Sequence, residues 1–305
     1  MRYQIRTVDV FSSQALEGNQ LAVVLGADDL DAGIMQSLAK EMNISETTFV
    51  AAPKKEGQLA SLRIFTPRTE LPFAGHPTLG TAYVLWSEGL VPPGVVDFTL
   101  GEKIGPIAIH VAQPDDDPIF WMTQPPVRFG EVWEERRRVA EALGLAEDDL
   151  VPDAPIQAAG VGVPYLYVPL KDAPRVDAAD PNPARVSLAF AAGSALPVLL
   201  FAIAGERHLY SRMFAGHTIG INEDPATGSA AGALGAFAAR YGMVSRRASM
   251  TLLDEQGTKM GRRSEILIKL AYSDDSELPH LVEVGGRVVP VIKGEVTLAA
   301  GGSEE

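Results

Sequence analysis

The sequence predicts an α+β fold made of two similar lobes, and three observations carry this prediction. A chain of 305 residues is most naturally two domains of roughly 150 residues each. Short strand patterns occur with only one or two helices and no regular βαβ alternation, which argues against a doubly wound parallel sheet. Two helical segments, 76–89 and 229–240, are apolar on all sides, so each belongs inside a layer of other structure.

The composition excludes several classes of partner and chemistry. Hydrophobic residues make up 46% of the chain and charged residues 21%, as in a globular protein with a sizeable core. The net charge of −13 argues against nucleic acid or an anionic membrane as a partner. The absence of cysteine excludes disulfides, zinc–thiolate sites, iron–sulfur clusters and thiol nucleophiles. No apolar signal region opens the chain and no stretch reads as a membrane span, so we expect a cytoplasmic protein.

The first lobe is predicted to span residues 1–118 and to consist mainly of strands. Alternating or β-branched runs predict these strands at 3–11, 21–25, 47–51, 59–66 and 95–100. Asp29 or Asp31 is placed to cap a helix that runs to about Met42. The apolar helix 76–89 then forms the centre of this lobe.

The second lobe is predicted to span residues 119–287, with the strand 288–300 returning to the first lobe. A charged amphipathic helix is expected at 131–144, and a buried helix followed by a buried strand at 188–205. The apolar helix 229–240 forms the centre. Near the end, Gly285-Gly286 between two strand-like runs has the pattern of a two-residue hairpin turn.

A weak internal repeat relates the two halves of the chain. Each half has an Arg-x-Phe strand, at 63–65 and at 212–214. A loop of about a dozen residues follows, and then a Thr- and Gly-containing helix start, at 75–78 and at 227–229. The repeat therefore supports two lobes of similar construction.

The two helix starts are candidate anion-binding sites. A helix N-terminus presents free N–H donors and a partial positive charge, which suits a carboxylate or a phosphate. Gly75 and Gly228 would let a ligand approach the backbone, and Thr78, Thr227 and Ser229 add hydroxyl groups. The alternative is that these polar residues only cap the helices, which is their commonest role.

Glu46, His76 and Asp224 are the candidate proton-transfer residues. Partial burial of Glu46 among apolar and small hydroxyl residues would raise its pKa toward the range that suits proton transfer, whereas the alternative is an exposed loop carboxylate. Asp224 precedes Pro225, so the alternative there is a simple turn. At a helix start the imidazole of His76 is more easily neutral than charged, and the alternative is a structural histidine.

Other reaction classes find no support in the motifs. The histidines show no paired spacing, so no metal site is expected. Ser229 lacks the Gly-x-Ser-x-Gly elbow of hydrolases. No Gly-x-Gly-x-x-Gly follows a strand and no phosphate loop is present, so we expect no nucleotide cofactor and no cofactor of any other kind.

Taken together, these strings resemble the PhzF-like phenazine-biosynthesis proteins, in the order of that family and over nearly the whole chain. The matching strings are 8–11, 18–19, 45–47, 63–67, 75–78, 223–230 and the Val284-Gly285-Gly286 segment. The resemblance implies a fold like that of diaminopimelate epimerase. Each lobe would be a strongly curved, mostly antiparallel sheet around its central helix, and the site would lie in the cleft between the lobes.

The resemblance also implies an activity. Members of the family use one glutamate, matching Glu46, to move a proton during isomerisation of a dihydro-hydroxyanthranilate. The same motifs match His76, Asp224, Ser229 and Asn19 to positions that hold the substrate, and family analogy implies a homodimer. Two-thiol racemisation is impossible in a chain without cysteine.

The sequence therefore predicts a cofactor-independent isomerase acting on a small carboxylate. Its alternatives are an epimerase of an amino or hydroxy acid, with a second group such as Asp224 opposite Glu46, and a non-catalytic carboxylate binder.

Overall fold

The first lobe is a curved sheet that wraps around the helix α2 (Gly75–Ser87). The computed structural model describes residues 1–181, 196–215, 222–273 and 276–298. Asp31 begins the outer helix α1 (Ala32–Met42) by accepting a hydrogen bond from the Ile34 amide over 2.9 Å. The strands of this lobe are β1 (Arg2–Val10), β2 (Asn19–Leu25), β3 (Glu46–Ala51), β4 (Ala60–Phe65), β5 (Glu70–Leu71), β6 (Asp97–Glu102) and β7 (Gly105–Ala112).

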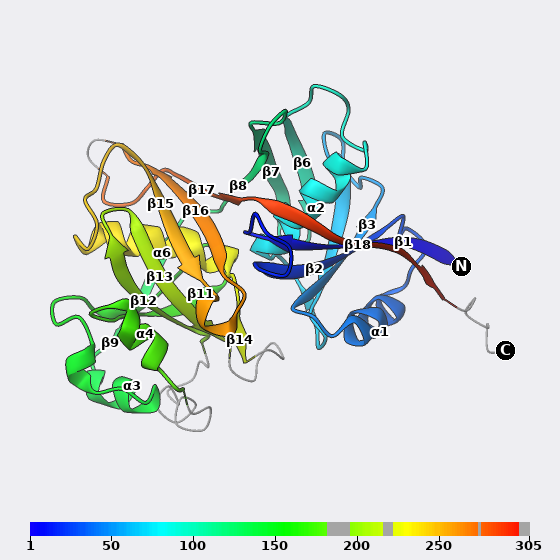
Figure 1. Ribbon diagram of the computed structural model, residues 1–305. Coiled ribbons are helices and arrows are strands. Elements are labelled where there is room, and N and C mark those ends of the chain that lie inside the picture. The colour runs from blue at the N-terminus through cyan, green and yellow to red at the C-terminus, as the bar shows by residue number, and fades with distance from the viewer. Residues whose placement is uncertain (182–195, 216–221, 274–275, 299–305) are drawn as a thin grey trace.

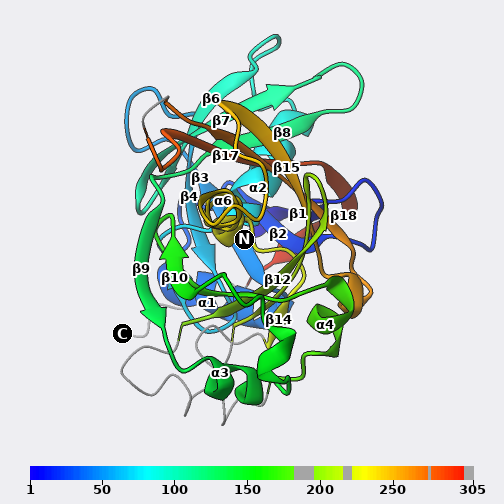
Figure 2. The same cartoon turned by 90° about the vertical axis from the view of Figure 1, so that its left-hand side faces the viewer.

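The second lobe repeats this plan around the helix α6 (Gly228–Arg240), which Figure 2 shows nearly end-on with strands around it. Two short helices, α3 (Arg136–Ala142) and α4 (Ala173–Ala178), lie on its outer side. Its strands are β9 (Arg128–Trp133), β10 (Ile156–Gly160), β11 (Pro164–Pro169), β12 (Val198–Gly205), β13 (His208–Phe214), β14 (Glu223–Asp224), β15 (Ser249–Gln256), β16 (Ser264–Ala271) and β17 (Leu281–Gly286).

The strand pairings of the two lobes correspond one to one. Among the described residues, parallel pairing occurs at β2–β3 and β4–β6 in the first lobe, and at the equivalent β11–β12 and β13–β15 in the second. All the other pairings are antiparallel. Both central helices have 13 residues. The predicted fold class, two similar lobes with a mostly antiparallel sheet around an apolar helix, is thereby confirmed.

The internal repeat corresponds to a repeated ion pair in front of each central helix. Arg63 on β4 bonds Glu70 on β5 through two nitrogens, and Arg212 on β13 bonds Glu223 on β14 in the same way. Each guanidinium also lies over the phenylalanine ring two residues later in its strand. Each glutamate precedes its helix by five residues. The weak repeat in the sequence is therefore a repeated structural unit that leads the chain into a buried helix.

Two strands join the lobes, as Figure 1 shows. The strand β8 (Ile119–Thr123) pairs with β7 on one side and with β17 on the other. The last strand, β18 (Val288–Thr297), pairs antiparallel with β1 over its length. Because β8 pairs with strands of both lobes, the predicted boundary between residues 118 and 119 stays a prediction.

Two local predictions were wrong. The helix expected at 131–144 begins only at Arg136, because the residues before it form β9 and pair with β10. Gly285 and Gly286 form no turn but lie inside β17, opposite β8. A Cβ on Gly285 would lie 2.5 Å from the ring of Trp121, so this glycine allows close packing on an aromatic side chain. The helix expected in the first part of 188–205 falls on residues outside the described ranges, and the strand expected after it is β12.

The core follows the same division. One large cluster fills the insides of both sheets around α2 and α6, and two smaller clusters lie under the outer helices of the two lobes. No helix among the described ranges has the length and apolar character needed to cross a membrane.

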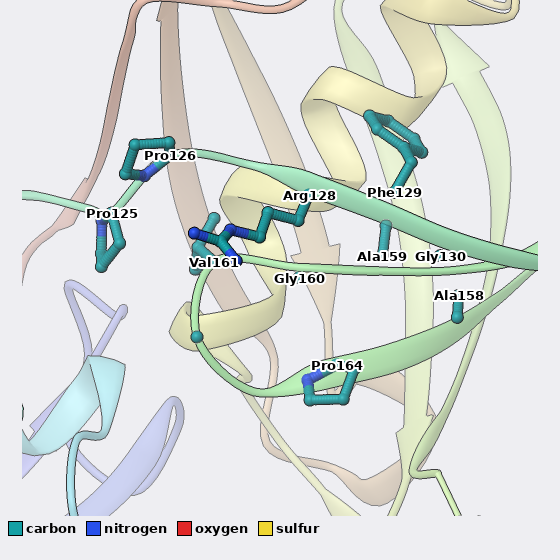
Figure 3. Close-up of a pocket in the computed structure, with 11 residues that line it drawn as sticks. Pro125, Pro126, Arg128, Phe129, Gly130, Ala158, Ala159, Gly160, Val161 and Pro164 are labelled. Carbon is teal, nitrogen blue, oxygen red and sulfur yellow. The ribbon is translucent and has the colours of Figure 1, made fainter.

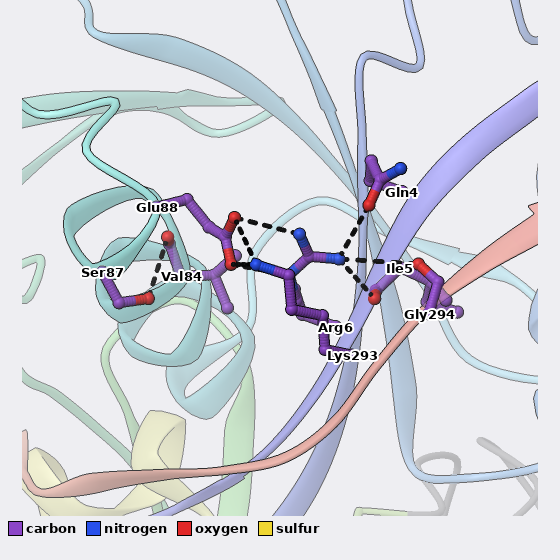
Figure 4. Close-up of polar contacts among 8 residues, drawn as sticks. All are labelled: Gln4, Ile5, Arg6, Val84, Ser87, Glu88, Lys293 and Gly294. Carbon is purple, nitrogen blue, oxygen red and sulfur yellow. Dashed lines mark hydrogen bonds and ion pairs between the residues drawn. The ribbon is translucent and has the colours of Figure 1, made fainter.

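The far end of α2 is fixed by an ion pair with β1 (Figure 4). Arg6 donates two hydrogen bonds to the carboxylate of Glu88, the C-cap residue of the helix, over 2.7 and 2.9 Å. A carboxylate at a helix C-terminus is unfavourable by itself, so the guanidinium offsets this cost. The same contact lowers the pKa of Glu88 to about 2.

Candidate active site

The N-termini of α2 and α6 meet head to head at the centre of the molecule. A Cβ on Gly75 would lie 2.6 Å from backbone atoms of Gly228 and Ser229, and a Cβ on Gly228 would lie 2.9 Å from the ring of Phe11. The two glycines were predicted to let a ligand reach the backbone. In the structure their first role is to let the two helix starts approach each other, which places both sets of amides at one point.

The capping alternative does not hold at these helix starts. The N-cap residues of the two helices, Ala74 and Thr227, make no side-chain capping hydrogen bond. No acceptor among the described residues bonds the first two amides of α2 or of α6. Free amides at two abutting helix ends are donors with an added dipole, so this point is suited to a carboxylate.

A buried polar network lies beside the helix starts and contains all three predicted proton-transfer residues. Asn19, at the start of β2, donates from Nδ2 to Asp224 Oδ1 over 2.7 Å and to the Ala226 carbonyl over 2.9 Å. Its Nδ2 is also 3.2 Å from Nδ1 of His76. The Nε2 atom of His76 lies 3.2 Å from Oε2 of Glu46. Residues from two lobes and four elements, β2, β3, α2 and β14, are thus brought into contact.

The contact between Glu46 and His76 is close but is not aligned as a hydrogen bond. Oε2 of Glu46 and Nε2 of His76 are both buried and have no hydrogen-bond partner among the described residues. Both carboxylate oxygens of Asp224, in contrast, accept hydrogen bonds, from Asn19 and from Thr227. Glu46 is therefore the carboxylate with an oxygen still available to a substrate.

Burial sets the protonation of this network. It raises the pKa of Glu46 well above its ordinary value, and the nearby Asp224 adds to this rise. Burial also raises the pKa of Asp224 to about 7, against the hydrogen bonds from Thr227 and Asn19. It lowers the pKa of His76 to about 3, although a hydrogen bond with the Gln20 backbone opposes this. At neutral pH His76 is therefore neutral, and burial favours the protonated form of both carboxyl groups.

Two site residues were not predicted from the sequence. Tyr165 on β11 shares a 2.7 Å hydrogen bond with Ser229 of α6, and burial raises the pKa of its phenol, with Asp224 and Glu46 adding to the rise. Gln256, at the end of β15, bonds Thr227 through both its side-chain oxygen and its nitrogen. Both residues stand in ordinary strand sequence, and only the pairing of strands brings them to the helix starts.

The two predicted threonines serve their own helix starts. Thr227 donates to Asp224 Oδ2 over 2.7 Å. Thr78 lies in the first turn of α2, 2.6 Å from the Ala74 carbonyl oxygen and 2.5 Å from Oε1 of Glu102. Both hydroxyl groups already make hydrogen bonds within the protein, so their predicted contact with a substrate stays a prediction.

A separate cavity of about 400 Å³ lies in the second lobe, between the Pro125–Pro126 segment and the loop that leads into β11 (Figure 3). Its lining is mostly apolar, with Arg128 as the one charged side chain. None of the predicted site residues lines it. Because it holds no group suited to proton transfer, we place the candidate active site at the helix starts.

The described part of the chain contains no group of three or more His, Asp or Glu residues arranged to hold a metal ion. Chemistry without a metal or cofactor stays a prediction.

The family model described as phenazine biosynthesis-like protein matches residues 8–294. The chain belongs to the PhzC/PhzF family. A trans-2,3-dihydro-3-hydroxyanthranilate isomerase of Pseudomonas aeruginosa is 35% identical over 294 residues, which cover 95% of this chain and 98% of that protein.

Solved structures of the PhzF type share the whole fold. A phenazine biosynthesis protein of the PhzF family from Bacillus anthracis superposes with a TM-score of 0.88 at 26% identity, covering 98% of this chain and all of the other. A predicted epimerase from Pseudomonas aeruginosa has a TM-score of 0.78 at 28% identity, covering 97% of this chain and all of the other. The predicted family and the predicted enzyme class, isomerase or epimerase, are confirmed.

Proposed function

We propose that this PhzF-like protein is an isomerase that moves a proton within a small carboxylate-bearing substrate, with Glu46 as the only proton-transferring group. The observation that carries the proposal is the position of Glu46. It is a buried carboxyl group with an unpartnered oxygen, beside two abutting helix N-termini whose first amides are free.

The substrate carboxylate would bind the free amides at Gly75-His76 and Gly228-Ser229. Fixed dipoles aimed at this point stabilise negative charge without reorganising during the reaction. The burial that raises the pKa of Glu46 also keeps water away from the reacting atoms. Glu46 in its ionised form would take a proton from carbon, and the resulting acid would return it to another carbon of the same substrate.

His76 would hold the substrate, and Asp224 would set the charge around Glu46. The neutral imidazole next to Glu46 can hydrogen-bond a hydroxyl or amino group in either direction. Asp224 is engaged at both oxygens, so its main effect on Glu46 is electrostatic.

An epimerase with Asp224 as a second base is the competing function, because the pKa of Asp224 is raised to about 7. Two observations favour the isomerase. First, both carboxylate oxygens of Asp224 already accept hydrogen bonds. Second, when the equivalent strands of the two lobes are aligned, the position of Glu46 is taken by Pro197 in the second lobe, which has no acidic group there. The outcome is read from the product: a moved double bond supports the isomerase, and an inverted stereocentre supports the epimerase.

The substrate to test first is trans-2,3-dihydro-3-hydroxyanthranilate, after which the relative in Pseudomonas aeruginosa is named. Replacing Glu46 with glutamine should abolish exchange of substrate protons with deuterated water and leave binding of the compound nearly unchanged. Glu131→Gln, an exposed glutamate on β9, is the matched control and should exchange as the wild type does. Exchange that persists in Glu46→Gln would show that another group moves the proton. Binding without any exchange in the wild type would indicate a non-catalytic carboxylate binder.

The predicted homodimer and the cytoplasmic location rest on the resemblance and the composition, and both stay predictions.

A further inference from the structure

A partly buried carboxyl group outside the polar network of the candidate active site, Glu102 at the end of β6, touches the first turn of α2. Its Oε1 atom lies 2.5 Å from the hydroxyl oxygen of Thr78. The same hydroxyl is 2.6 Å from the carbonyl oxygen of Ala74, the residue that begins the helix. The other carboxyl oxygen, Oε2, is buried and has no hydrogen-bond partner among the described residues.

The hydrogen bonds of Thr78 bear on whether Glu102 is protonated. A carbonyl oxygen only accepts, so the single hydroxyl proton of Thr78 goes to Ala74. Thr78 then has no proton left for Glu102. Two oxygens 2.5 Å apart need a proton between them, and an ionised carboxylate would supply none. A protonated Glu102 would supply the missing proton by donating to Thr78, which would complete a chain from Glu102 through Thr78 to Ala74.

The internal repeat gives Glu102 a counterpart in the second lobe. On β4, Ser61 pairs with Gly101 of β6, so Leu62 stands opposite Glu102. In the second lobe Arg212 is equivalent to Arg63, so Ser211 is equivalent to Leu62. Ser211 pairs with Gln256 of β15, and Gln256 is therefore the counterpart of Glu102.

Gln256 holds the start of α6. Its Nε2 atom donates to the Asp224 carbonyl over 2.7 Å and to the Thr227 hydroxyl over 3.0 Å. Its oxygen accepts from the Thr227 amide over 3.1 Å. At equivalent places, each lobe therefore has a side chain that is within hydrogen-bond distance of a threonine hydroxyl at the start of its central helix.

We propose that Glu102, held as a neutral carboxylic acid, is the positioning residue that fixes the first turn of α2 for substrate binding, as Gln256 fixes the start of α6. The inference rests on the proposed function, because it assumes that the helix starts hold the substrate carboxylate. Glu102 contacts the helix and acts on the substrate through it.

The surroundings of Glu102 agree with a neutral acid whose ionisation is within reach. Burial raises its pKa to about 8. A hydrogen bond donated by Thr78 lowers this pKa, and the contact of the same hydroxyl with the Ala74 carbonyl competes with that bond. Glu102 lines a cavity of about 210 Å³. The other charged residues of this cavity are Lys54 and Lys55 in the loop before β4, Arg63 on β4, Glu70 on β5, and Lys103 next to Glu102. On α2 the titratable groups are His76, which is neutral, and Tyr83, whose pKa is raised by burial.

Ionisation of Glu102 should weaken substrate binding in two ways. An ionised Glu102 can only accept, so the Thr78 hydroxyl turns its proton to the carboxylate, and the hydrogen bond from Thr78 to the Ala74 carbonyl is lost from the first turn of α2. A negative charge also appears beside the helix start where the substrate carboxylate binds, and like charges repel. We therefore expect the KM to rise about three- to tenfold as the pH increases through 8, with little change in kcat.

The variant that tests this is Glu102→Gln, which gives the first lobe the residue that the second lobe already has. Its amide can donate to Thr78 at every pH, so its KM should stay level above pH 8. Glu102→Leu removes the donor and should show the raised KM at all pH values. Glu131→Gln should keep the alkaline rise of the wild type. An alkaline rise that persists unchanged in Glu102→Gln would overturn the proposal.

An infrared measurement separates this proposal from the proposed function, because it needs no substrate. The difference spectrum of wild type minus Glu102→Gln should show the band of a protonated carboxyl group at neutral pH, and the band should fade above pH 8. Absence of the band at neutral pH would overturn the proposal even in an active enzyme. If the wild type neither binds nor turns over trans-2,3-dihydro-3-hydroxyanthranilate, the proposed function with this substrate fails, and the band alone decides the state of Glu102.

Discussion

Replacing Gly75 with alanine would test whether the contact between the two helix starts is needed for activity. The added Cβ would lie 2.6 Å from the Gly228 carbonyl carbon and from the Ser229 amide nitrogen, whereas ordinary contact begins at 3.4 Å. The neighbours are backbone atoms, so the two helix starts must separate by the difference of about 0.8 Å. Misplacement by about 1 Å costs a well-oriented reaction roughly 100-fold in rate. We therefore expect the rate of proton exchange to fall by about two orders of magnitude.

The matched control is Gly80→Ala, one turn further along the same helix. There the Cβ would lie 2.6 Å from a methyl group of Leu21 and 2.7 Å from one of Val10, both of which are ends of side chains. Each variant should lose about 1–3 kcal/mol of unfolding free energy from overpacking, partly offset by the better helix propensity of alanine. Urea unfolding measures this loss, and substrate deuterium exchange measures the rate. A Gly75→Ala enzyme that is as fast as Gly80→Ala would show that the distance between the helix starts does not control the chemistry.

Two further substitutions test the electrostatics and the neighbours of the site. Asp224→Asn removes the charge that adds to the effect of burial on the pKa of Glu46. The acid limb of the pH–rate profile should therefore move to lower pH. A limb that stays in place would mean that Asp224 does not act on Glu46. Tyr165→Phe removes the hydrogen bond to Ser229 and keeps the ring, so substrate affinity should fall about two- to tenfold, the effect of one hydrogen bond. Calorimetric titration measures that affinity, and an unchanged value would place Tyr165 outside the binding site.

The fold was predictable where apolar patterns and turn chemistry act locally. A helix that is apolar on all sides, such as 229–240, has only one stable place, inside a sheet. The helix start at Asp31 follows from its capping side chain. The glycines of β17 show the limit of this reasoning. Gly285 lies next to Gly286, as in a hairpin, but the reason for this glycine is the ring of Trp121, which is far away in the sequence.

The site was predictable for the residues that stand in motifs at a helix start or a strand start. Asn19, Glu46, His76 and Asp224 all come together in one network, as expected. Tyr165 and Gln256 were missed because each reaches the site through strand pairing, which no local spacing reveals. Glu102 was missed because no local spacing shows that the end of β6 lies against Thr78 in the first turn of α2.

The repeat accounts for the single base that we propose on a nearly symmetric scaffold. Both lobes deliver a 13-residue helix to the same point, behind the same Arg–Glu pair, with a strand residue holding its first turn. A scaffold of this kind supplies two sets of amides, which suits one carboxylate bound between them. The side chains that face this point differ: the position of Glu46 is occupied by Pro197 in the other lobe. Symmetric binding with an asymmetric base favours moving a proton along one face of the substrate over exchanging protons between two faces.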